Sequence, residues 1–130
     1  MTENEIAKMV VDKSIHIHKA LGPGLLESVY QRILAYELRK AGLEVETESP
    51  VPVEWDGHII DESFRADMVI NSIVLLELKS VEQSLAVHRK QTLTYLKLTD
   101  IKLGLLINFG AELLKNDLHR IVNNLPEQVT

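Results

Sequence analysis

Two neighbouring apolar segments of the chain contain charged residues at positions where a buried strand normally has none. Asp67 interrupts the first segment, residues 64–70. Glu77 and Lys79 interrupt the second segment, residues 73–80. Charged side chains are almost never fully buried unless they are paired with one another or coordinate a metal. These three residues therefore indicate a functional site rather than part of an ordinary core.

These residue types suit the hydrolysis of a phosphodiester bond. Glu77 and Lys79 are two residues apart, so they point to the same side of a strand. Two carboxylates on adjacent strands can converge on a hard cation such as magnesium, and a lysine beside them can hold water or stabilise developing negative charge. An ion pair between Glu77 and Lys79, with Asp67 exposed at the rim, explains the pattern equally well, because such short motifs recur by chance.

The connection between the two strands decides whether their carboxylates can meet. A two-residue turn at Asn71-Ser72 would pair Asp67 with Leu76 and leave Glu77 on the opposite side of the sheet. An odd-length loop or a bulge is required for the carboxylates to share a face, for instance with Ile70 opposite Val74. The metal-site hypothesis therefore predicts such a connection.

Further polar candidates lie on two predicted helices. With Gly24 as the N-cap, Glu27 is at N3, where a carboxylate complements the helix dipole, and this alone explains Glu27. His88, Gln91 and Tyr95 share one side of a later helix because of their spacing. The amide and the phenol either satisfy hydrogen bonds of the core or line a cleft beside the strand with the Glu-x-Lys pattern.

Apolar residues at helical spacing predict three helices. The first covers residues 3–21 and is ended by Gly22-Pro23-Gly24. The second runs from about Leu26 to Leu38 and ends at Ala41-Gly42, with the glycine at C′. The third covers residues 84–98.

The intervals between the helices show strand patterns, with Asp56-Gly57 as a hairpin turn. The predicted strands cover residues 43–47, 51–55, 58–64, 64–70, 73–80 and 103–108. Glu44, Glu46 and Glu48 indicate a solvated strand face, and a last amphipathic segment covers residues 113–122 before fraying beyond Pro126. The order of these predicted helices and strands along the chain predicts an α/β fold with a central mixed β-sheet flanked by helices. The strand–helix–strand unit near the end of the chain is expected to be parallel.

Composition indicates one ordinary globular domain. A length of 130 residues fits a single domain over residues 1–130. The absence of cysteine excludes disulfides and thiolate chemistry. No apolar run has membrane-spanning length and the acidic start is unlike a signal peptide, so we expect a cytoplasmic location. The net charge of −5 argues against binding nucleic acid by bulk electrostatics, although not against a local basic groove.

Four motifs, in this order along the chain, resemble the PD-(D/E)XK nuclease superfamily. They are Gly24-x-x-Glu27-x-x-Tyr30, Asp67, Glu77-Leu78-Lys79 and Gln91-x-x-x-Tyr95. The chain is most similar to the small GxxExxY proteins, with RecB-like and lambda-exonuclease-like motifs. The likeness extends from about His18 to Val122, and Ala66 stands where the superfamily's name has proline.

The resemblance implies a restriction-endonuclease-like core that cleaves phosphodiester bonds with Mg²⁺ or Mn²⁺. By position in the motifs, the catalytic residues would be the metal-binding acids, a lysine and an auxiliary pair: Glu27, Asp67 and Glu77; Lys79; and Gln91 and Tyr95.

The sequence therefore favours a metal-dependent nuclease acting on nucleic acid, DNA more than RNA. The alternative is a non-catalytic module that keeps the nuclease fold and binds nucleic acid or assembles with other proteins. A small acidic domain offers little surface for a long duplex, so a homodimer or a delivery protein is a natural partner. No membrane partner is expected.

Overall fold

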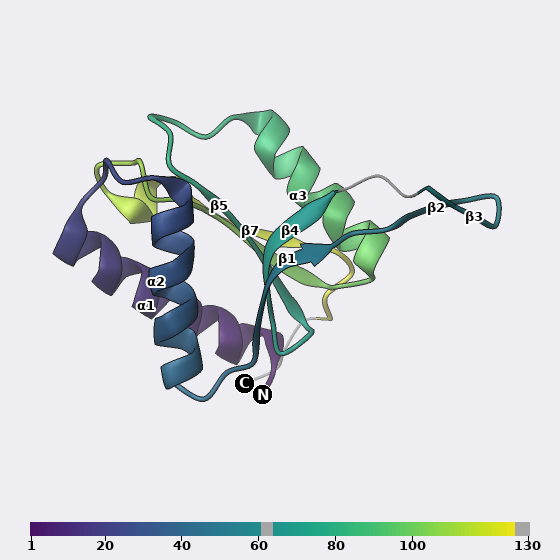
Figure 1. Ribbon diagram of the computed structural model, residues 1–130, viewed down its shortest axis with the longest axis horizontal. Helices are drawn as coiled ribbons and strands as arrows, with labels where there is room; N and C mark the ends of the chain where they lie inside the picture. Colours follow the sequence, from purple (N-terminus) through teal and green to yellow (C-terminus); the bar gives the residue numbers. More distant parts are fainter. Residues whose placement is uncertain (61–63, 127–130) are drawn as a thin grey trace.

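The computed structural model describes residues 1–60 and 64–126, and its centre is a five-stranded sheet (Figure 1). In spatial order its strands are β1 (Val45–Pro50), β4 (Arg65–Ile70), β5 (Val74–Lys79), β6 (Leu103–Asn108) and β7 (Leu118–Val122). Strands β5 and β6 are parallel and the other neighbours are antiparallel. The predicted α/β fold, with a mixed sheet and a parallel unit, is confirmed.

Helices cover both faces of this sheet (Figure 1). Helices α1 (Glu3–Leu21) and α2 (Glu27–Lys40) pack on one face, and α3 (Ala86–Thr99) packs on the other. The predicted C-terminal ends of the first two helices are confirmed: α1 stops before Gly22, and Gly42 follows α2 with a φ of +94°, a conformation that glycine adopts without strain.

Each helical layer has its own core. Met68, Ile70 and Leu76 pack against α1 and α2, while Leu75 and Leu96 belong to the core beneath α3. Apolar residues occupy both faces of β4, β5 and β6, which explains why these strands appear in the sequence as nearly continuous apolar runs.

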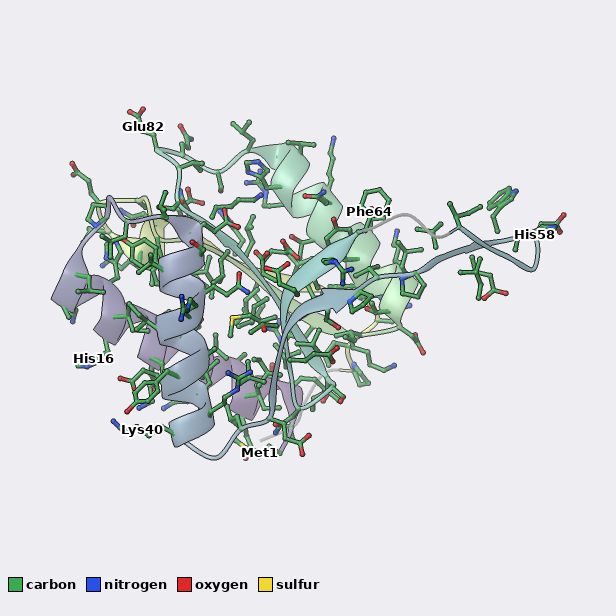
Figure 2. All side chains as sticks on the ribbon, viewed as in Figure 1. Met1, His16, Lys40, His58, Phe64 and Glu82 are labelled. Atoms are coloured by element: carbon green, nitrogen blue, oxygen red, sulfur yellow. The ribbon has the colours of Figure 1, made fainter. Side chains whose placement is uncertain are left out.

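A two-stranded arm projects from the body of the molecule (Figure 1). It consists of β2 (Val53–Trp55) and β3 (His58–Ile60), joined by the predicted Asp56-Gly57 turn, and Figure 2 shows His58 at its far end. Strand β2 begins later than predicted, because Val51 is buried in the core beneath α3 and does not pair within the arm. Strand β3 covers the start of the strand predicted over residues 58–64. The rest of the predicted strand, residues 61–63, lies outside the described residues.

The C-terminal amphipathic segment forms a short 3-10 helix, η1 (Leu114–Asp117), followed by the edge strand β7. The predicted fraying concerns residues 127–130, which lie outside the described residues. Within the described part of the chain, no helix is both long and apolar enough to cross a membrane.

Candidate active site

The hairpin between β4 and β5 brings Asp67 and Glu77 together. Ile70 pairs with Val74 and Met68 with Leu76, so the connection has an odd number of residues. The left-handed backbone of Asn71, with a φ of +50°, helps the chain to reverse direction there. In this register Asp67 lies opposite Glu77, as the metal-site hypothesis required.

Beyond the pair Met68 and Leu76, the carboxylates of Asp67 and Glu77 accept hydrogen bonds from the backbone of the neighbouring strand. The backbone N–H of Asp67 donates to Oε1 of Glu77 at 3.2 Å. The backbone N–H of Leu78 donates to Oδ2 of Asp67 at 2.7 Å. Each carboxylate is therefore held by the backbone of the neighbouring strand, which fixes both side chains between β4 and β5.

The local environment disfavours negative charge on these side chains. Burial, together with the charge of Asp67, raises the pKa of Glu77 to about 8. Burial also raises the pKa of Asp67, although the hydrogen bond from Leu78 opposes this. Clustered carboxylates repel one another and lose hydration when buried, and both effects favour the protonated form. Without a cation, Glu77 holds its proton at neutral pH.

Glu27 approaches the same site from α2, where it occupies a different helix position from the predicted one. Leu26 is the N-cap, so Glu27 is the first helical residue rather than N3. Burial and the charge of Asp67 raise the pKa of Glu27, while the charge of Lys79 lowers it. Glu27 is therefore near enough to both residues to interact with them through its charge.

Tyr30 explains the last position of the Gly-x-x-Glu-x-x-Tyr motif in structural terms. Its fully buried ring stacks on Phe109, with 4.6 Å between ring centroids. Its hydroxyl group donates to the carbonyl of Gly22 at 2.5 Å and accepts from the N–H of Leu25 at 3.3 Å. Tyr30 thus anchors the loop that leads into Glu27.

Lys79 is half-buried at the end of β5. Among the described residues, the ion pairs within 4.0 Å involve other side chains, and none joins Glu77 to Lys79. Asp67 is half-buried rather than exposed at a rim. The structure thus lacks the ion pair that would have explained these residues without a site.

Tyr95 connects α3 to the carboxylates. Its hydroxyl group accepts a hydrogen bond from Nε2 of Gln91 at 3.2 Å. Burial raises the pKa of Tyr95, and the charges of Glu77 and Asp67 raise it further. Tyr95 is therefore both a buried residue and a neighbour of the site, whereas Gln91 is exposed. His88 instead accepts the N–H of Leu85 at 3.0 Å, which caps the start of α3.

The carboxylates suit a hard cation by chemistry, since magnesium and manganese prefer oxygen ligands. Asp67 and Glu77 lie together, and Glu27 interacts with Asp67 through its charge. In residues 1–60 and 64–126, however, no three acidic or histidine side chains lie close enough to one another to hold a metal ion as they stand.

Two residues near the site were not identified from the sequence. Nε2 of Gln31 donates to Oε1 of Glu48 at 3.2 Å and to the backbone carbonyl of Asp67 at 3.3 Å. Glu48 is exposed, as predicted, yet its charge helps to raise the pKa values of both Glu27 and Asp67. Gln31 had one signal, its position four residues after Glu27 on the same helix face. Glu48 had no such signal in the sequence, because it becomes a neighbour of Asp67 only through the pairing of β1 with β4.

A mixed sheet flanked by helices, with an aspartate and a Glu-x-Lys pattern on two adjacent central strands, defines a restriction-endonuclease-like core. The family model of the PD-(D/E)XK nuclease superfamily matches residues 4–121, and the chain belongs to this superfamily. No curated protein and no solved structure matches the chain.

Proposed function

We propose that the protein is a nuclease of the GxxExxY type that hydrolyses phosphodiester bonds, in DNA rather than RNA, with Mg²⁺ or Mn²⁺. The supporting observation is the pair of hydrogen bonds that holds the carboxylates of Asp67 and Glu77 against the backbone between β4 and β5. Lys79 lies two residues beyond Glu77 on the same strand. Glu77 and Lys79 have the spacing of the (D/E)XK part of the superfamily's name.

The roles follow from chemistry. Asp67 and Glu77, with Glu27, would hold the cation, which when bound polarises phosphate oxygens and acidifies water. Lys79 would orient the attacking water and offset negative charge that develops on the phosphate. Tyr95 and Gln91 would border the site on the α3 side.

One observation favours a second candidate, a non-catalytic module that retains the fold. In the described part of the chain no three potential ligands are gathered into a metal cluster. Such a module would bind nucleic acid or a partner protein without needing a cation.

Cleavage assays decide between the two candidates. The substrates are single-stranded, double-stranded and branched DNA, with matched RNA, each incubated with Mg²⁺ or Mn²⁺. We expect cleavage by the wild-type protein and none by Asp67→Asn, which should also bind Mn²⁺ more weakly in calorimetry. Lys79→Ala should lose cleavage but bind Mn²⁺ as tightly or more tightly, because a neighbouring positive charge is removed.

Glu46→Gln is the matched control, since Glu46 is an exposed carboxylate of β1 opposite Val69. It should cleave like the wild type. If no substrate is cut but nucleic acid binds without a cation, the non-catalytic candidate is correct. Cleavage that persists in both Asp67→Asn and Lys79→Ala would remove the proposed site.

The same proposal includes a partner and a location. A domain of 130 residues offers little surface for a long duplex, and its net charge of −5 gives it no bulk attraction to nucleic acid. A homodimer would enlarge the contact surface, or a delivery protein would bring the domain to DNA in the cytoplasm. Light scattering of the purified protein tests the homodimer directly.

A further inference from the structure

A side-chain amide of α2, one turn from Glu27, hydrogen-bonds to two neighbouring strands of the sheet. Nε2 of Gln31 reaches both the carbonyl of Asp67 on β4 and Oε1 of Glu48 on β1. Gln31 and Glu27 are four residues apart, so they lie on the same side of the helix. This amide therefore connects α2, the helix that carries Glu27, to the backbone of Asp67.

The first turn of α2 has no side-chain cap of its own. Leu26, the N-cap, makes no side-chain capping hydrogen bond, and Glu27 is the first helical residue. Residues at an uncapped helix start are held less firmly than those one turn further in. Gln31 lies one turn in and donates directly to the carbonyl of Asp67, so this contact links the start of α2 to the strand that carries Asp67.

Glu48 lies where the regularity of the sheet is interrupted. Thr47 pairs with Met68 and Ser49 with Ala66, so Glu48 is opposite Asp67. Its φ is +51°, which is uncommon for a residue other than glycine. Ala66 and Met68 also pack into opposite cores although residues two apart in a regular strand share a face. The strand geometry thus changes where Gln31 binds.

We propose that Gln31 is a positioning residue of the site, oriented by Glu48, that sets the placement of Glu27 relative to Asp67. This inference rests on the proposed function, since its consequence is the strength of cation binding. The hydrogen bond from Gln31 to Glu48 is exposed, and the longer one to the carbonyl of Asp67 is only part-buried. Exposed hydrogen bonds of this kind contribute little to folding stability, so its loss should affect the site more than the fold.

The test is calorimetric binding of Mn²⁺ without nucleic acid, together with thermal unfolding. Gln31→Met keeps the length of the side chain and removes the amide. We expect it to weaken Mn²⁺ binding by about tenfold, the lower end of the range for residues that orient metal ligands, with a melting temperature close to that of the wild type. Gln31→Asn, which keeps the amide but shortens its reach, should behave in the same way. Gln83→Met, the same change at an exposed position, is the control.

Two substitutions of Glu48 separate its hydrogen bond from its charge. Glu48→Gln removes the charge but can still accept from Gln31, whereas Glu48→Ala removes both. We expect Glu48→Ala to bind Mn²⁺ several-fold more weakly than Glu48→Gln. That difference should vanish in a Gln31→Met background, because Glu48 then has no amide to orient.

The outcomes distinguish this inference from the proposed function. A wild-type protein that binds no Mn²⁺ refutes both. Wild-type binding that Asp67→Asn weakens, but that Gln31→Met and Gln31→Asn leave unchanged, supports the site and refutes the positioning role. A Glu48→Ala to Glu48→Gln difference that persists in the Gln31→Met background refutes the part assigned to Glu48.

Discussion

The raised pKa of Glu77 predicts that the protein loses stability as the pH increases from acidic to weakly basic values. Burial and the charge of Asp67 raise this pKa from its ordinary value of 4.5 to about 8. The folded state therefore binds a proton that the unfolded state releases above pH 4.5. Since the folded state binds more protons, unfolding free energy falls with increasing pH in this window. The contribution is complete below pH 4.5 and is lost as the pH passes through about 8.

The size of the effect follows from the same two values. At about 1.4 kcal/mol for each pH unit, the difference between 4.5 and about 8 corresponds to on the order of 5 kcal/mol of unfolding free energy. Glu77→Gln tests this, because glutamine resembles the protonated acid and its Oε1 can still accept the N–H of Asp67. The variant should lose most of the pH dependence and be more stable than the wild type above about pH 8.

Urea unfolding at several values between about pH 5 and about pH 8.5 provides the measurement. Glu46→Gln, an exposed change on β1, should keep the wild-type dependence. A wild-type stability that stays constant or increases over this range would refute the reasoning. So would a Glu77→Gln variant that becomes less stable with pH as steeply as the wild type.

Three further outcomes are expected. Hydrogen bonds outweigh burial and lower the pKa of Asp117 to about 2, so its stabilisation is present above pH 3.8 and is lost towards pH 2; Asp117→Asn should cost about 2 kcal/mol at neutral pH in urea unfolding. Gly110→Ala should lower the free energy of unfolding by about 1–3 kcal/mol or more, seen as a lower melting temperature, because a Cβ there would lie 2.1 Å from the carbonyl oxygen of Val81. Gln91→Ala should reduce cleavage more than stability; a cost mainly in stability, about 1–3 kcal/mol, would show that it serves only to satisfy Tyr95.

Local sequence patterns were sufficient for much of the fold. Helix α1 was predicted with its observed ends because its apolar spacing and the following Gly22 agree. Strand β6 was predicted at Leu103–Asn108 because a short apolar run between turns has few alternatives. The arm was predicted less well, since Val51 leaves the strand pattern to fill the core beneath α3, a demand that no local pattern contains.

The chemistry of the site was also visible in the sequence, because charged residues inside apolar strands are costly and therefore conspicuous. Asp67, Glu77 and Lys79 were found for this reason. Even the odd-length connection could be deduced, since side chains alternate along a strand and only one class of register lets two carboxylates meet.

Only the tertiary structure decided how the helices meet the strands at this site. The sequence placed Glu27 at the third position of its helix, but the chain begins α2 at Glu27 itself. Neither Gln31 nor Glu48 is a charged residue within an apolar run, so neither was conspicuous in the sequence. They became neighbours of Asp67 through helix packing and strand pairing. Composition and spacing along the chain determine which chemistry is present, whereas contacts between residues distant in sequence depend on how whole elements pack.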